Sequence, residues 1–137
     1  MEQKEGHMMS ILDEINSFRD QLSRFVELIE NMIREGERMN PVPESVGFCE
    51  EARQVFEKYL RQIDSGFAVR NADHIIHAIL RIDSSLGQFT EYDLNWSVLW
   101  RRTDAREQMR QSTQALIHST KIVDRESEIQ SDLLAGK

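Results

Sequence analysis

Apolar or small residues recur along the first third of the chain at alternating spacings of four and three positions. They are Ile11, Ile15, Phe18, Leu22, Phe25, Ile29, Met32, Gly36 and Met39. This heptad spacing places them on one face of an α-helix. Leu12, Val26 and Ile33 widen the stripe on one side, which favours a multi-helix bundle over a two-stranded coiled coil. The pattern therefore predicts a long core helix over residues 9–39.

Two shorter helices are predicted after this first one. Two prolines within residues 40–43 exclude a helix there, because proline lacks an amide donor and restricts its own φ and the preceding residue. A second helix is expected to begin at residue 44 or 45 and to stop at Gly66. Asn71 is a suitable N-cap for a third helix, which is expected to end near Gly87.

The last predicted helix differs from the others because it carries two separate apolar faces. Thr90-x-x-Asp93 has the form of a capping box, which predicts a start near residue 91 and a course to beyond Asp124. Large and small residues alternate along one seam, formed by Ala105, Met109, Ser112, Leu116, Ser119 and Val123. A second patch lies near the start of the helix and consists of Tyr92, Trp96, Leu99 and Trp100. A helix with two apolar faces is expected to contact two neighbours.

The predicted fold is all-α: an antiparallel, up-down-up-down bundle of about four helices, two long and two shorter, with coiled-coil-like packing. Residues 1–8 are expected to be a disordered N-terminal segment or a cloning remnant. Residues 9–126 are expected to form a single helical-bundle domain, and residues 127–137 a frayed C-terminal tail. Helices of unequal length leave ends uncovered, which predicts a homodimer formed through the overhanging ends.

Composition narrows the classes of function. The chain of 137 residues has a formal net charge of −7, which disfavours nucleic acid as a partner because phosphates require Lys and Arg. No apolar run approaches the roughly 20 residues of a membrane span. The single cysteine, Cys49, cannot form an internal disulfide and fits a reducing compartment, so a soluble cytoplasmic protein is predicted. The sequence contains no Gly-rich phosphate loop and no Cys-x-x-Cys, so no cofactor is expected.

One segment suggests an enzyme. In Arg70-Asn71-Ala72-Asp73-His74-Ile75-Ile76-His77, six residues separate Arg70 from His77, and an asparagine follows the arginine. This segment resembles the Arg-x(4–6)-His motif of HEPN-type domains, small helical bundles with frequent ribonuclease activity. The resemblance covers eight residues of 137. It implies metal-independent RNA cleavage, in which His77 acts as acid and base and Arg70 stabilises the developing charge. The same two residues also fit a surface position without a chemical role.

The same segment provides a second alternative, a metal or small-ligand site. His74 and His77 are one helical turn apart, and Asp73 and His77 are i, i+4 neighbours, so either pair can share a helix face. A di-iron bundle would need Glu-x-x-His on two helices, and the sequence has none.

The last predicted helix offers the surface with the best physical rationale for binding. Arg102, Arg106 and Arg110 form an i, i+4, i+8 stripe, close to the aromatic patch that contains Tyr92, Trp96 and Trp100. Trp, Tyr and Arg dominate interaction hot spots. The aromatic residues also fit an ordinary position in the core, and the arginines also fit a solvated stripe on the helix surface. We therefore expect a non-enzymatic helical-bundle protein that acts through protein–protein contacts as an adaptor, chaperone or regulatory subunit. Its partner would be a second copy or another protein.

Overall fold

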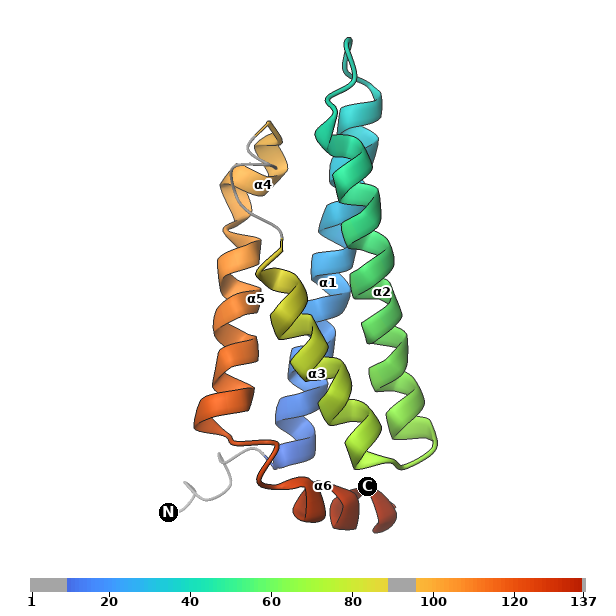
Figure 1. The fold of residues 1–137 in the computed structure, drawn as a ribbon, viewed down its shortest axis with the longest axis vertical. Helices are drawn as coiled ribbons and strands as arrows, with labels where there is room; N and C mark the ends of the chain where they lie inside the picture. Colours follow the sequence, from blue (N-terminus) through green and yellow to red (C-terminus); the bar gives the residue numbers. More distant parts are fainter. Residues whose placement is uncertain (1–9, 89–95, 137) are drawn as a thin grey trace, which may run out of the picture.

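The computed structural model describes residues 10–88 and 96–136, and the backbone alone at 102 and 103. The elements in this part are α1 (Ile11–Glu37), α2 (Ser45–Ala68), α3 (Ala72–Leu86), α4 (Val98–Thr103), α5 (Ala105–Gln114), the π-helix η2 (Ala115–Ser119) and α6 (Glu126–Leu134). The described residues contain no strand, so the all-α prediction is confirmed (Figure 1). The expected N-terminal segment, residues 1–8, and the capping box Thr90-x-x-Asp93 lie outside the described residues.

α1 follows the predicted core helix closely. The Ser10 side chain caps its N-terminus by accepting a hydrogen bond of 3.1 Å from the Asp13 amide. The residues of the predicted stripe are buried from Ile11 to Gly36. Met39 is 42% exposed, because α1 ends at Glu37 and the turn before the two prolines carries this residue out of the core.

α2 runs antiparallel to α1 and continues two residues past its predicted stop. Gly66 lies inside α2 and is buried. A Cβ atom at this position would overlap the Ile75 side chain of α3, so Gly66 allows the two helices to approach closely. The chain leaves α2 through Arg70, whose φ of 56° lies in the left-handed region. Asn71 then caps α3 by accepting a hydrogen bond of 3.1 Å from the His74 amide, as predicted.

The prediction of one long fourth helix is wrong within the described residues, because the helix is interrupted at two points. Asp104, with φ of 53°, separates α4 from α5. The helix ends again at Ser119, and Lys121 with φ of 57° follows. Asp is one of the few residues that enters the left-handed region without a large penalty. The start of α4 is held at Ser97, whose hydroxyl accepts from the Trp100 amide at 3.2 Å and donates to Glu35 of α1 at 2.7 Å.

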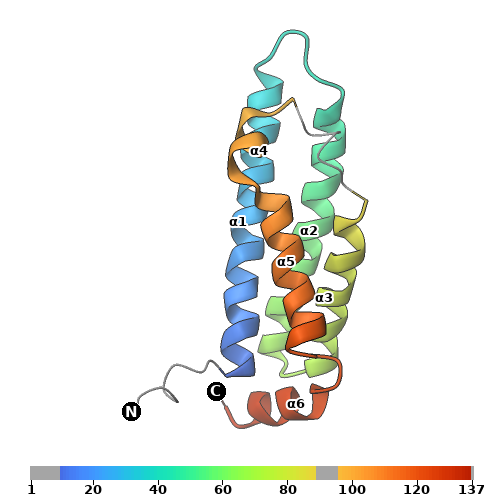
Figure 2. The same ribbon diagram turned by 90° about the vertical axis from the view of Figure 1, so that its left-hand side faces the viewer.

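The segment expected to be a frayed tail contains α6. Ile129 is completely buried and Leu133 is 4% exposed, so one face of this short helix joins the core. The Gln130 side chain donates to the Arg70 carbonyl at 2.7 Å and accepts from the Ala72 amide at 2.8 Å. These contacts hold α6 across the end of the bundle at which α1 and α3 begin (Figures 1 and 2). Two apolar residues four positions apart and the hydrogen bonds of Gln130 therefore dock the segment against the core.

The core lies among α1, α2, α3 and α5, which run alongside one another (Figure 2). The α1–α2 hairpin extends beyond α3 and α5, and α4 lies beside its upper part (Figure 1). Among the helices of the described residues, none combines the length and the apolar character that crossing a membrane requires.

Candidate interaction surface

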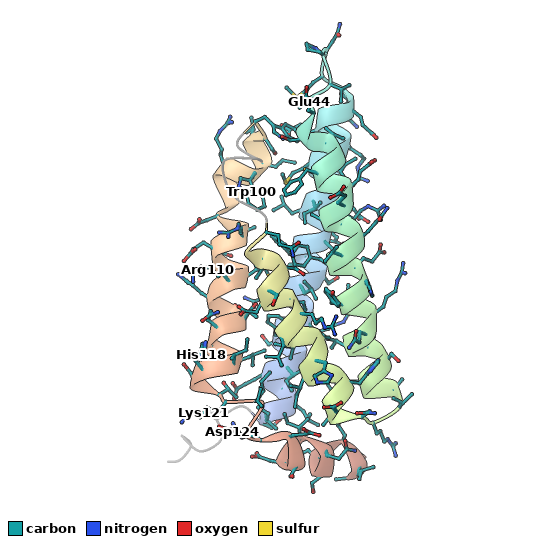
Figure 3. The ribbon with its side chains drawn as sticks, viewed as in Figure 1. Glu44, Trp100, Arg110, His118, Lys121 and Asp124 are labelled. Atoms are coloured by element: carbon teal, nitrogen blue, oxygen red, sulfur yellow. The ribbon has the colours of Figure 1, made fainter. Side chains whose placement is uncertain are left out.

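The two tryptophans of the predicted aromatic patch belong to the core. Trp100 is 5% exposed, and its ring centroid lies 6.2 Å from that of Phe25 on α1 (Trp100 is labelled in Figure 3). Trp96 is half-buried against Gly36, where an added Cβ would come within 2.9 Å of the indole. Its indole nitrogen is buried and has no hydrogen-bond partner within the described part of the chain. Tyr92 lies outside the described residues, so the aromatic part of the predicted surface is not exposed where the structure describes it.

The predicted arginine stripe is divided between different partners. Arg106 donates to the Leu86 carbonyl at 2.9 Å and so caps the C-terminal end of α3. Arg110 donates two hydrogen bonds, of 3.0 and 2.6 Å, to Glu107 one turn earlier on α5. These bonds lower the pKa of the Glu107 carboxyl. The Arg102 side chain lies outside the description, and each of the two described arginines donates hydrogen bonds within this chain.

Arg70 and His77, the residues of the HEPN-type resemblance, are both exposed. The Arg70 backbone is tied to α6 through Gln130, while its side chain lies in the α2–α3 turn. His77 lies on α3, with Nε2 3.6 Å from the Asp73 carboxylate. Within residues 10–88 and 96–136, no hydrogen bond or ion pair joins Arg70 to His77. Ribonuclease activity therefore remains a prediction from the sequence.

The predicted metal ligands are brought together only in part. Asp73 and His77 approach each other on the outer face of α3. His74 is half-buried, and its carbonyl accepts a hydrogen bond of 2.9 Å from Gln62 of α2. No cluster of three or more His, Cys, Asp or Glu side chains suited to a metal occurs in the part of the chain that the structure describes.

Sequence reasoning missed a groove between α1 and α5. It consists of two adjoining hollows of about 220 and 240 Å³, which share Gln21 at their boundary. The upper hollow is lined by Gln21, Arg24, Phe25, Leu28, Ala105, Gln108 and Met109. The lower hollow is lined by Glu14, Ser17, Phe18, Gln21, Ser112, Ala115, Leu116 and Thr120. We call this surface the α1–α5 groove.

The floor of the α1–α5 groove is apolar, and its walls are uncharged apart from Glu14 and Arg24. Phe18, Phe25, Met109 and Leu116 form the floor and are each at most 4% exposed. The walls carry Ser17, Ala105, Ser112 and Ala115, so α5 stays narrow where it passes α1. Two patterns in the sequence could have indicated this groove. One is the small-residue seam of α5, and the other is a second heptad stripe on α1 formed by Ser17, Gln21, Arg24 and Leu28.

The α1–α5 groove has two charged lining residues, one in each hollow. Glu14 in the lower hollow accepts a hydrogen bond of 3.0 Å from the Thr120 hydroxyl. It also lies close enough to Arg125 to raise the pKa of that arginine, although the hydrogen bond to Glu128 raises it more. Arg24 in the upper hollow is exposed and has no ion pair within the described residues. The groove is therefore an apolar trough with an acid in one half and an available base in the other.

Comparison of the chain with protein-family models, with curated proteins and with solved structures returns no match. A functional proposal must therefore be based on the α1–α5 groove and on the exposed residues around it.

Proposed function

We propose that the protein is a non-enzymatic helical-bundle protein that works through protein–protein contacts, as an adaptor, chaperone or regulatory subunit. The α1–α5 groove is its contact surface. The observation that carries this proposal is an apolar floor between two helices, flanked mainly by uncharged side chains, which is the form of a site that accepts another helix.

The size of the groove favours a helix over a small molecule. The two hollows, of about 220 and 240 Å³, adjoin at Gln21 and form an elongated, open trough along α1, whereas small-molecule sites enclose most of their ligand. The groove extends along α1 from Glu14 to Leu28, a distance of about 21 Å at about 1.5 Å per residue. A helix of about four turns would cover this length and insert one or two side chains into each hollow.

The finer description of the fold belongs to the same proposal. α1, α2, α3 and α5 act as an antiparallel four-helix bundle with coiled-coil-like packing, supported by the heptad spacing of the buried residues of α1. A second copy of the chain, as in the predicted homodimer, and another protein are both candidate partners for this surface. A cytoplasmic location is supported by Cys49, a buried free thiol.

A photo-crosslinker placed in the groove tests the proposal. Benzoylphenylalanine replaces Ser17, which is exposed and lines the lower hollow, in cells that express the protein. The matched control carries the same group in place of Gln54, which is exposed on α2. We expect a protein adduct from position 17 that is absent or much weaker from position 54. Equal adducts at the two positions, or none at position 17, would contradict a contact surface in the groove.

A further inference from the structure

We propose that the occupant of the α1–α5 groove is a second copy of this chain, packed groove to groove with the two α1 helices antiparallel. This inference rests on the proposed function, because it needs the groove to be a contact surface. It adds the identity of the partner and its orientation.

The charges of the groove lining specify the orientation. Glu14 and Arg24 are its two charged residues, and they lie ten positions apart on α1, about 15 Å along the helix. A twofold axis that crosses α1 between them exchanges its two ends. Arg24 of each copy then approaches Glu14 of the other copy, so the dimer contains two equivalent Arg24–Glu14 contacts. A parallel arrangement would instead place like charges against each other, which disfavours it.

Both charged groups are available for such a contact. Arg24 has no ion pair among the described residues, so it would not have to leave another partner. Glu14 accepts from Thr120 through one oxygen, and a carboxylate can accept several hydrogen bonds at once.

The centre of the groove permits close approach. Ser17 and Gln21 on α1, and Ser112 on α5, are uncharged where the twofold axis would pass. Small residues at this point let the backbones of two helices come together, and the apolar floor beneath them supplies the contact. Because the whole chain carries a net charge of −7, two copies repel each other at long range. The local pairs between Arg24 and Glu14 are therefore expected to determine whether the copies associate.

Charge reversal tests this arrangement by sedimentation velocity over about 1–100 µM, a range that covers weak to moderate dimers. The wild-type chain is expected to dimerise. Arg24→Glu and Glu14→Arg are each expected to weaken dimerisation about a hundredfold, because each reversal creates two like-charge contacts. A one-to-one mixture of the two variants is expected to restore a dimer, because one chain then carries only acids in its groove and the other only bases.

Two control variants show whether the loss of the dimer depends on charges inside the groove and not on the change in net charge. Arg34→Glu makes the same change in net charge as Arg24→Glu at an exposed position of α1 that does not line the groove, so the dimer should persist. Glu27→Arg makes the same change in net charge as Glu14→Arg at an exposed position of α1 that does not line the groove, and it should also leave the dimer intact. Far-ultraviolet circular dichroism confirms that each variant is folded.

Three results would overturn the inference: a monomeric wild-type chain over the whole range, a dimer insensitive to both reversals, or a mixture that stays monomeric. The photo-crosslinker at position 17 distinguishes failure of the second-copy inference from failure of the proposed function. An adduct with a different protein overturns the second copy but keeps the groove as a contact surface, whereas no adduct overturns both.

Discussion

The two parts of the chain, α1–α3 and α4–α6, are built in different ways. In α1–α3, each helix is continuous and buries a stripe of apolar residues that is visible in the sequence. In α4–α6, the helices have six, ten and nine residues, and non-glycine residues with positive φ lie at Asp104 and Lys121. A dense apolar stripe stabilises a continuous helix by packing along its whole length. Where apolar residues are sparse, local contacts determine where each helix begins and ends.

Hydrogen bonds from side chains to neighbouring helices supplement the sparse apolar packing of α5 in the second part. α5 buries Met109 and Thr113 and is otherwise polar. It is held to α3 by Arg106 on the Leu86 carbonyl and by Gln114, which donates to Asp83 at 2.7 Å. This difference predicts that α1–α3 will respond most to changes in packing volume, and α4–α6 to changes in hydrogen bonds and backbone conformation.

The largest effect is expected from a cavity in the first part. Phe56 is 1% exposed, and its ring meets Phe25 edge to face at a centroid distance of 5.2 Å. Phe56→Ala should lower the free energy of unfolding by about 3–5 kcal/mol, because it removes buried area and leaves a cavity. Urea denaturation measures this loss, and a loss below about 1 kcal/mol would contradict the packing described for α1 and α2.

A pair of glycine substitutions in α2 gives effects of opposite sign. Gly66→Ala should destabilise by about 1–3 kcal/mol, because the new methyl group overlaps Ile75. Gly47→Ala meets open space and should stabilise by up to about 1 kcal/mol, because alanine has the higher helix propensity. Thermal unfolding distinguishes the two, and equal shifts in Tm would argue against a close approach of α2 and α3 at Gly66.

The sequence predicts the first part of the fold better than the second for a physical reason. The core stripe of α1 and the Asn71 cap are local patterns, and both are present as expected. The breaks at Asp104 and Lys121 depend on tertiary contacts, which propensity cannot reveal. The sequence leaves open whether Trp100 lies in the core or on an interaction surface, and in the structure it packs beside Phe25 of the distant helix α1. The two stripes that line the α1–α5 groove are present in the sequence, but their pairing depends on the contact between two distant helices, which the sequence alone does not give.

Removing a bridging side chain tests how α6 is held. Gln130→Ala loses both hydrogen bonds to the α2–α3 turn and should cost about 1–2 kcal/mol. Amide exchange at Ala72 should accelerate, because its donor loses its partner. Gln54→Ala, at an exposed position of α2, is the matched control. Unchanged exchange at Ala72 would show that α6 docks through Ile129 and Leu133 alone.

A glycine at the break between α4 and α5 should stabilise the second part slightly. Asp104→Gly relieves the left-handed conformation of a non-glycine residue and is expected to add about 0.5–1 kcal/mol. Gln111→Gly, inside α5, should cost about as much, because glycine disfavours a regular helix. If Asp104→Gly were as destabilising as Gln111→Gly, the break would not lie at Asp104.

The smallest structural effect is expected on α3. His77 is exposed and, among the described residues, pairs only with Asp73, so His77→Ala should change the free energy of unfolding by less than about 0.5 kcal/mol. The wild-type chain is expected to leave single-stranded RNA intact in the presence of a chelator. Metal-independent cleavage that disappears in His77→Ala would instead establish the HEPN-like ribonuclease and contradict a non-enzymatic function.

Cysteine accessibility in cells tests most directly whether the α1–α5 groove is a contact surface. Burial raises the pKa of the Cys49 thiol to about 11, so this residue stays unreactive at neutral pH and an introduced cysteine is labelled selectively. Ser17→Cys reports on the groove and Gln54→Cys on α2. The labelling rate at position 17 should be several-fold lower in cells than in dilute purified protein, with no change at position 54. Equal rates in both settings at position 17 would contradict the proposed function.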